Sequence, residues 1–297
     1  MDNHRNTFRL RTIILLSADV FLLIICFLHV PSLTHRAVFP FSFDEHDSST
    51  VLLSSTPTIE SGDKLLSVGY STPKNNSELQ FLADLHSAGD SIEVKFERDH
   101  IAKDVVLHFN NYYASDRFII LTFFVGIMII IVSVLMILAI PREPLIVLLH
   151  NLFVSLGSAL MLSWGTVALT LISYVIVTLF FSSYSLFGVT FFWFTYSMWN
   201  GAFIPINWKR VSSYVLAAAF SITLTLLYIS SIKTQSLQAY QLFSNAWFIF
   251  HLVIVLSITV GMILLVLSTR KAVTQEERVR SRWIAAGIII GGIPFAV

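Results

Sequence analysis

Residues 144–208 contain no Asp, Glu, Lys or Arg, and this uncharged run limits the possible folds more than any other feature of the chain. About 20 consecutive apolar residues are enough to cross a bilayer. The whole chain is 55% hydrophobic and 12% charged. Ordinary globular chains carry about twice that share of charged residues. The sequence therefore predicts a membrane protein, and it offers no basic excess for binding nucleic acid.

The charged residues divide the chain into two unlike parts. Residues 31–117 hold thirteen acidic and seven basic residues, whereas the rest holds five acidic and twelve basic ones. We therefore expect a membrane α-helical bundle with a small α+β domain inserted between the first two spans. Residues 1–30 would form a cytoplasmic N-terminus and first anchor, 31–117 an extracytoplasmic domain, and 118–297 a multi-span bundle. The lone Cys26 excludes a disulfide framework and a Cys-built metal site.

The positive-inside rule decides how often the uncharged run crosses the membrane. Two crossings place eleven basic residues on the N-terminal side and leave only Lys233 opposite, whereas three crossings would scatter them over both sides. The predicted spans are roughly 10–30, 118–140, 145–168, 180–206, 211–232, 244–268 and 283–297. Residues 169–182 are then an outer loop or a re-entrant piece. The N-terminus is expected in the cytoplasm and the chain in a plasma (inner) membrane.

The first and last predicted spans indicate whether the chain is cleaved at its start and whether it continues at its end. The first span competes with a cleaved signal peptide, but Asp19 lies within the apolar run and no small-residue cleavage site follows it. An uncleaved anchor is favoured. The last span, 283–297, has fifteen residues and is too short to cross. We therefore expect the chain to continue beyond Val297.

The inserted segment has alternating patterns that predict strands around one helix. Residues 65–70 alternate after a turn, residues 77–88 place apolar side chains at helical spacing, and residues 92–97 alternate apolar with charged residues. A turn at 98–100 and a further strand over 105–109 complete a hairpin. The order resembles the C-terminal two-thirds of a bacterial PDZ domain, carried by Gly62-Asp63-Lys64-Leu65-Leu66-Ser67-Val68, then 79–85 and 92–98.

A PDZ-like domain after one span and before a helical bundle is similar to the input region of PDZ-bearing bacterial sensor histidine kinases. This resemblance implies detection of a peptide or lipid signal, a C-terminal kinase domain, a response regulator as partner and a homodimer. One departure concerns peptide capture, because PDZ domains bind a carboxylate on a glycine-containing loop. No glycine precedes Gly62 in the insert, and Pro40 lacks a backbone donor.

Two groups of residues in the insert are candidates for ligand binding. Phe39, Phe41 and Phe43 alternate and could offer one apolar face to a ligand, although core packing or membrane contact is the favoured explanation. Gly62 and Asp63 begin the PDZ-like segment and are the second group.

Three ionisable residues in the spans suggest a polar switch between the first helix and the bundle. Asp19 lies in mid-span, where a carboxylate is costly and needs a partner. His150 and His251 are the candidate partners, and the alternative is a protonated Asp19 bonded to a nearby Ser or Thr. The two histidines differ by about 10 Å in depth when 1.5 Å is counted per helical residue, so a shared metal is not expected.

Residues near the C-terminal end form the last candidate group. Arg278, Arg280, Arg282 and Trp283 would either relay bundle motion into the cytoplasm or anchor the chain at lipid headgroups. No motif of a metalloprotease, serine hydrolase or nucleotide-binding enzyme occurs, so no catalytic residue, metal or cofactor is predicted. A transporter component with an extracellular cap domain is the alternative function, and a PDZ-containing intramembrane protease ranks last.

Overall fold

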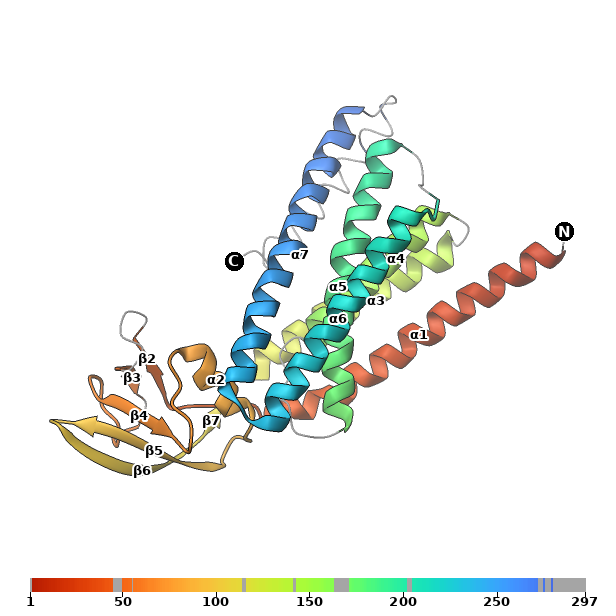
Figure 1. Ribbon diagram of the computed structural model, residues 1–297. Helices are drawn as coiled ribbons and strands as arrows, with labels where there is room; N and C mark the ends of the chain where they lie inside the picture. The colour runs from red at the N-terminus through yellow and green to blue at the C-terminus, as the bar shows by residue number, and fades with distance from the viewer. Residues whose placement is uncertain are drawn as a thin grey trace.

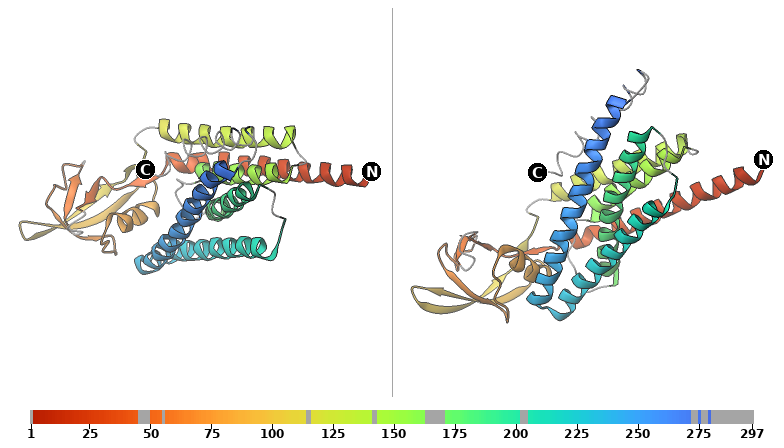
Figure 2. Two further views of the ribbon diagram at one scale, coloured as in Figure 1. Left: turned by 90° about the horizontal axis from the view of Figure 1, so that it is seen from above. Right: turned by 45° about the horizontal axis from the view of Figure 1, so that its top comes forward.

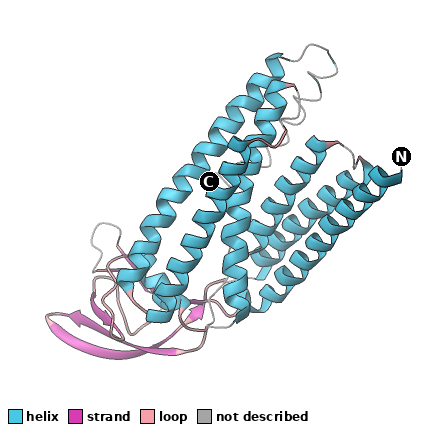
Figure 3. Ribbon diagram, turned by 45° about the vertical axis from the view of Figure 1, so that its right-hand side comes forward, coloured by secondary structure: helices cyan, strands magenta, loops and turns pink. Residues whose placement is uncertain are grey.

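The computed structural model describes residues 2–44, 50–54, 56–113, 116–140, 143–162, 171–201 and 205–271, together with 275 and 279. Six long apolar helices in these ranges are long enough to cross a membrane, which identifies a multi-pass membrane protein. Strands gather at one end of the helices (Figures 1 and 3). The long helices are α1 (Asp2–Thr34), α3 (Asp116–Ala139), α4 (Pro144–Leu162), α5 (Leu171–Asn200), α6 (Trp208–Thr234) and α7 (Leu237–Lys271).

Over the described residues, helix α5 corrects the start of the predicted span 180–206 and replaces the predicted outer loop or re-entrant piece over 171–182. It runs from Leu171 to Asn200, so the pair Ser182-Ser183 lies inside a helix. The Ser182 hydroxyl bonds the Ser221 hydroxyl of α6 at 2.9 Å, and this contact satisfies a polar group within the bundle. Gly201, with φ of +68°, follows the helix end. The seventh predicted span, 283–297, lies outside the described residues.

Small residues allow the helices to approach each other closely. A Cβ atom added to Gly157 of α4 would lie 2.8 Å from the Gly126 carbonyl oxygen of α3. A Cβ atom on Gly188 of α5 would lie 2.6 Å from Ile254 of α7. Helix α5 packs against α4, α6 and α7, and α6 lies on the opposite side of the bundle from α3 (Figure 2). Glycines at such crossings are typical of membrane helix pairs.

The inserted domain holds one three-stranded antiparallel sheet and two short strand pairs. The sheet order is β4 (Lys64–Val68), β5 (Ser91–Arg98) and β6 (Ile101–His108). Asp99 and His100 both have positive φ and form the tight turn between β5 and β6. The paired short strands are β1 (Ala37–Val38) with β7 (Asn110–Asn111), and β2 (Phe41–Phe43) with β3 (Val51–Ser54).

Helix α2 (Asn76–Asp84) is the only helix among the described residues of the domain. The Asn75 side chain accepts a hydrogen bond from the Glu78 N–H and caps the helix, which begins one residue before the predicted segment 77–88 and ends four residues before its end. Leu79, Phe81 and Leu82 turn into the domain core. Strands β1 and β7 pair where the chain enters from α1 and leaves toward α3, so the two ends of the domain lie side by side.

Candidate functional site: a domain-to-bundle junction and a buried polar pair

The three phenylalanines predicted as a ligand face belong to the domain core. Phe39, Phe41 and Phe43 are each at most 5% exposed. The Phe39 ring contacts both Phe41 and Phe109, with ring centroids 5.3 and 4.7 Å apart. The prediction of an exposed apolar face is therefore corrected to core packing, because a domain this small needs its large side chains for its own interior.

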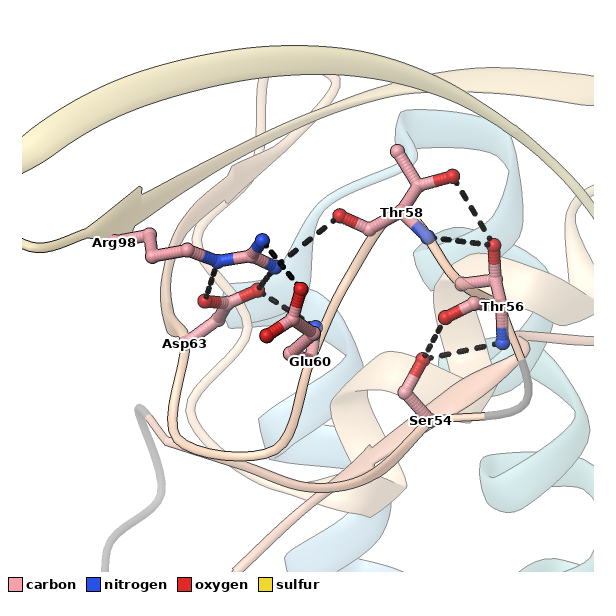
Figure 4. A network of polar contacts seen from close by, with 6 residues as sticks. All are labelled: Ser54, Thr56, Thr58, Glu60, Asp63 and Arg98. Atoms are coloured by element: carbon pink, nitrogen blue, oxygen red, sulfur yellow. Dashed lines mark hydrogen bonds and ion pairs between the residues drawn. The ribbon is translucent and has the colours of Figure 1, made fainter.

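Gly62 and Asp63 form a structural loop. Asp63 is 3% exposed and its two carboxylate oxygens accept from Arg98 Nε at 2.7 Å and from Arg98 Nη2 at 2.6 Å (Figure 4). The Gly62 N–H donates to the Val51 carbonyl at 2.9 Å. Hydrogen bonds from Arg98 hold the pKa of the Asp63 carboxyl below its usual value, although burial acts in the opposite direction. The Gly62 N–H and the Asp63 carboxylate therefore already have hydrogen-bond partners within the domain.

The same arginine organises the loop that leads into β4. Arg98 Nη1 contacts the Glu60 carboxylate at 2.7 Å, and Arg98 Nη2 donates to the Thr58 carbonyl at 3.3 Å. Thr58 is hydrogen-bonded to Thr56, and Thr56 is hydrogen-bonded to Ser54, through side-chain and backbone groups (Figure 4). The loop is therefore fixed at both ends, by Asp63 and by Ser54.

Asp19 and His150 lie together inside the bundle. Asp19 is 4% exposed and His150 1% exposed, and the Asp19 Oδ2 atom is 3.3 Å from His150 Nε2. On the other side of the ring, His150 Nδ1 lies 2.6 Å from the Ser133 hydroxyl of α3. The sequence suggested the Asp19–His150 pair but not Ser133, because serine is common in membrane helices and carries no special signal. The pair joins α1 to α4, and Ser133 extends the contact to α3.

His251 does not take part in that group. Its Nδ1 atom lies 2.7 Å from the Tyr184 hydroxyl of α5, and its side chain is exposed on the surface of the bundle. Of the three residues predicted as one polar switch, the structure brings together Asp19 and His150 and leaves His251 elsewhere. The described residues include no cluster of three or more His, Cys, Asp or Glu side chains suited to a metal ion.

The junction between domain and bundle was not predicted from the sequence. The Phe81 ring of α2 stacks on the Tyr240 ring of α7, with centroids 4.3 Å apart and planes 17° from parallel. The Tyr240 hydroxyl lies 2.8 Å from the Ser77 hydroxyl. Ile232 of α6 is 1% exposed and belongs to the same apolar cluster as the domain core. The domain and the bundle thus share one continuous apolar interior.

A buried carboxylate strengthens this junction. Glu78 is 3% exposed and its Oε1 atom accepts from the Gln241 side-chain amide of α7 at 2.8 Å. Its Oε2 atom accepts from the Lys74 N–H at 2.8 Å. Figure 1 shows α2 beside the domain end of α7. The first turns of α7 therefore precede its apolar run and pack against the domain.

A second link joins the domain to the end of α1. Arg36 forms two hydrogen bonds with the Asp84 carboxylate of α2, at 3.0 and 3.2 Å, and its guanidinium lies 3.9 Å from the centroid of the Tyr112 ring. Burial opposes the charge of Arg36, but attraction to Asp84 outweighs it and raises the pKa of the guanidinium. Arg36 therefore fastens the exit of α1 to the helix that contacts α7.

The predicted C-terminal relay, Arg278, Arg280, Arg282 and Trp283, lies outside the part of the chain whose side chains the structure describes. The last described turn of α7 does make one contact with α5. The Lys271 ammonium lies 3.9 Å from the centroid of the Trp199 ring, a cation–π geometry. Helix α7 is thus attached to the domain at one end and to α5 at the other.

Comparisons of the chain with protein-family models, with curated proteins and with solved structures found no match.

Proposed function

We propose that this chain is the signal-input region of a bacterial membrane sensor of the histidine kinase type. In this proposal a PDZ-like domain outside the cytoplasm and the helical bundle together respond to a peptide or membrane-borne signal. An output domain beyond Val297 would then receive the change from the last helices. The observation that supports this proposal best is the shared apolar interior of the domain and α6–α7, centred on Phe81 and Tyr240.

The junction gives the domain a physical means of acting on the bundle. Two packed elements with a continuous core change their arrangement together more readily than two elements joined by a flexible linker. Arg36 links α1 to α2, and Glu78 links α2 to α7. A signal that favours one arrangement of the domain would therefore bias the positions of both helices. The Asp19–His150 pair would hold α1 against α4 during this change.

One contact between α2 and β2 bears on how a PDZ-like domain would bind a peptide here. Helix α2 lies next to β2, where the Asn76 side-chain oxygen accepts from the Phe43 N–H at 2.8 Å. In a PDZ domain a peptide adds as a strand in the groove between a helix and a strand. Here the Asn76 side chain bonds the N–H and the carbonyl of Phe43, the last residue of β2, beside the start of α2. We therefore propose a signal that acts on the junction rather than a peptide in this groove.

A distance measurement across the bundle tests the coupling. Spin labels at Asn200→Cys and Arg270→Cys, in a Cys26→Ala background, report the separation of α5 and α7 at the end far from the domain. We expect Tyr240→Ala to shift or broaden this distribution in lipid nanodiscs, and Tyr240→Phe, which keeps the stacked ring, to leave it unchanged. Hydrogen exchange would show whether α2 is released from α7 in Tyr240→Ala. If α2 is released and the distance distribution is still unchanged, the coupling between the domain and the bundle is overturned.

A biochemical assay tests the class of output. Membranes containing the product of the native gene are incubated with radiolabelled ATP, and acid-labile phosphohistidine is measured. The proposal expects labelling whose rate changes in the Tyr240→Ala variant. Absence of labelling together with solute uptake that requires Asp19 would instead establish a transporter component.

A further inference from the structure

Helices α3 and α4 hold each other through a reciprocal pair of glycine contacts. The Met161 side chain of α4 fills the space beside Gly126 of α3, where an added Cβ atom would lie 2.5 Å from Met161 Cγ. In return, the Ile130 side chain of α3 fills the space beside Gly157 of α4, where an added Cβ atom would lie 2.8 Å from Ile130 Cγ1. Each helix therefore inserts a side chain beside a glycine of the other, and neither can slide along its partner without a clash.

His150 adds polar contacts to this pair and joins α1 to it. Its Nδ1 atom lies 2.6 Å from the Ser133 hydroxyl of α3, and its Nε2 atom lies 3.3 Å from Asp19 Oδ2 of α1. All three side chains are buried. Buried polar groups in a membrane protein are costly to separate from their partners, because lipid offers no replacement. Helices α1, α3 and α4 therefore form one unit, which we call the anchored unit.

Helix α5 makes its polar contacts with α6 and α7. The hydrogen bonds that join these three helices are Ser182 with Ser221, Trp193 with Ser213, and Tyr184 with His251. Gly188 of α5 also faces α7, since a Cβ atom there would lie 2.6 Å from the Ile254 side chain. Helices α5, α6 and α7 therefore form a second group, connected within itself by hydrogen bonds and close packing.

The face between α4 and α5 differs from the contacts within either group. It consists of large buried apolar side chains, which are Leu148, Leu149 and Leu152 of α4 and Phe191, Trp193 and Phe194 of α5. Among the side chains that the structure describes, no hydrogen bond joins α4 to α5. The single glycine of each helix faces elsewhere, Gly157 toward α3 and Gly188 toward α7. Packed helices slide by small amounts in shear motions, and this face offers the least resistance to such sliding.

The inserted domain is attached to helices on both sides of this face. Arg36, at the exit of α1, bonds the Asp84 carboxylate of α2 at 3.0 and 3.2 Å. The Phe81 ring of the same helix α2 stacks on Tyr240 of α7, with centroids 4.3 Å apart. A change in the position of α2 relative to either contact therefore acts between the anchored unit and the second group.

We propose that the bundle contains a built-in sliding surface, the apolar face between α4 and α5, along which the domain shifts α5, α6 and α7 relative to the anchored unit. This inference rests on the proposed coupling between the domain and the bundle, and it adds which helices move and which stay together. The reciprocal glycine contacts and His150 keep α3 and α4 fixed to each other during the movement.

Spin labels in lipid nanodiscs test the sliding surface, in a Cys26→Ala background of the full chain. A label at Asn151→Cys of α4 is paired with Leu138→Cys for the α3–α4 distance and with Asn200→Cys for the α4–α5 distance, and all three native side chains are exposed. In Tyr240→Ala we expect the α4–α5 distance to shift by about 2 Å, the size of a helix shear movement, and the α3–α4 distance to stay unchanged. Tyr240→Phe keeps the stacked ring and should leave both distances unchanged.

Gly157→Ala is the positive control, because a Cβ atom there would separate α3 from α4 and change the α3–α4 distance. Equal changes of the α3–α4 and α4–α5 distances in Tyr240→Ala would overturn the anchored unit and with it the inference. A change confined to the α5–α7 distance between Asn200 and Arg270 would overturn the sliding surface but leave the coupling between domain and bundle intact. No change in any of the three distances, with α2 released from α7, would overturn the proposed coupling itself.

Discussion

Tyr240 of α7 and Phe81 of α2 stack with their ring centroids 4.3 Å apart, although 158 residues separate them in the chain. This contact joins the soluble domain to a membrane helix. Tyr240→Ala should weaken the junction by about 2 kcal/mol, because an aromatic pair and its buried area are lost. We expect amide hydrogens of α2 to exchange about 30-fold faster, since each 1.4 kcal/mol is a factor of ten.

Tyr240→Phe is the matched control for this prediction. It keeps the stacked ring and removes only the hydroxyl contact with Ser77, which is exposed. Exchange in α2 should then rise by less than about ten-fold, as expected for one hydrogen bond. Equal effects of the two substitutions would show that the stacking contributes nothing to the junction.

The buried pair Asp19–His150 is tested by a double-mutant cycle. Asp19→Leu or His150→Phe alone leaves a buried polar partner unmatched and should cost about 3 kcal/mol of unfolding free energy. The double variant should cost less than the sum, because both polar groups are then gone. Thermal unfolding in detergent measures all four proteins, with Ser158→Ala as a control on α4. Additive losses would mean that the two side chains do not interact.

The sequence predicted the parts of this fold that follow from hydropathy and charge. Each of the six described long helices overlaps a predicted apolar span, but α7 begins at Leu237 rather than at 244, and α5 begins at Leu171 rather than at 180, where Ser182-Ser183 suggested a break. A single serine pair does not interrupt a membrane helix when a neighbouring helix supplies a hydrogen-bond partner, here Ser221. Hydropathy contains no information about that neighbour.

Contacts between distant segments were not predictable in the same way. Asp19 required a partner, and His150 was one of two residues at a suitable position, because ionisable side chains are rare in spans. Phe81 and Tyr240 are ordinary core residues by type, so nothing in the sequence paired them. The structure shows where these residues lie: α7 has 35 residues, extends beyond the predicted span 244–268 and exceeds the bilayer thickness at the usual helical rise. Its surplus turns carry Tyr240 and Gln241.

The crossing of α3 and α4 depends on two glycines. A Cβ atom on Gly157 would lie 2.8 Å from the Gly126 carbonyl oxygen and 2.8 Å from the Ile130 side chain. Gly157→Ala should therefore push the helices apart and cost about 1–3 kcal/mol, the usual range for overpacking. Thermal unfolding in detergent measures the loss, and Asn151→Ala on the exposed face of α4 is the control. A Gly157→Ala protein as stable as wild type would contradict the close crossing.

The Asp63–Arg98 ion pair predicts a specific pH dependence. Because Arg98 lowers the pKa of Asp63 in the folded domain, the carboxylate stabilises the fold above the usual Asp pKa of about 3.9. This stabilisation is lost as the pH falls through the lower, folded-state pKa. Asp63→Asn should therefore unfold at a lower temperature than wild type at pH 7, and the difference should shrink below about pH 4.

Asp104→Asn is the control, because Asp104 pairs with Lys95 on the domain surface, where both side chains are about half exposed and such pairs contribute little. Scanning calorimetry of the full chain from pH 7 to 3 measures both variants. A constant difference between wild type and Asp63→Asn over that range would show that the carboxylate charge does not stabilise the loop.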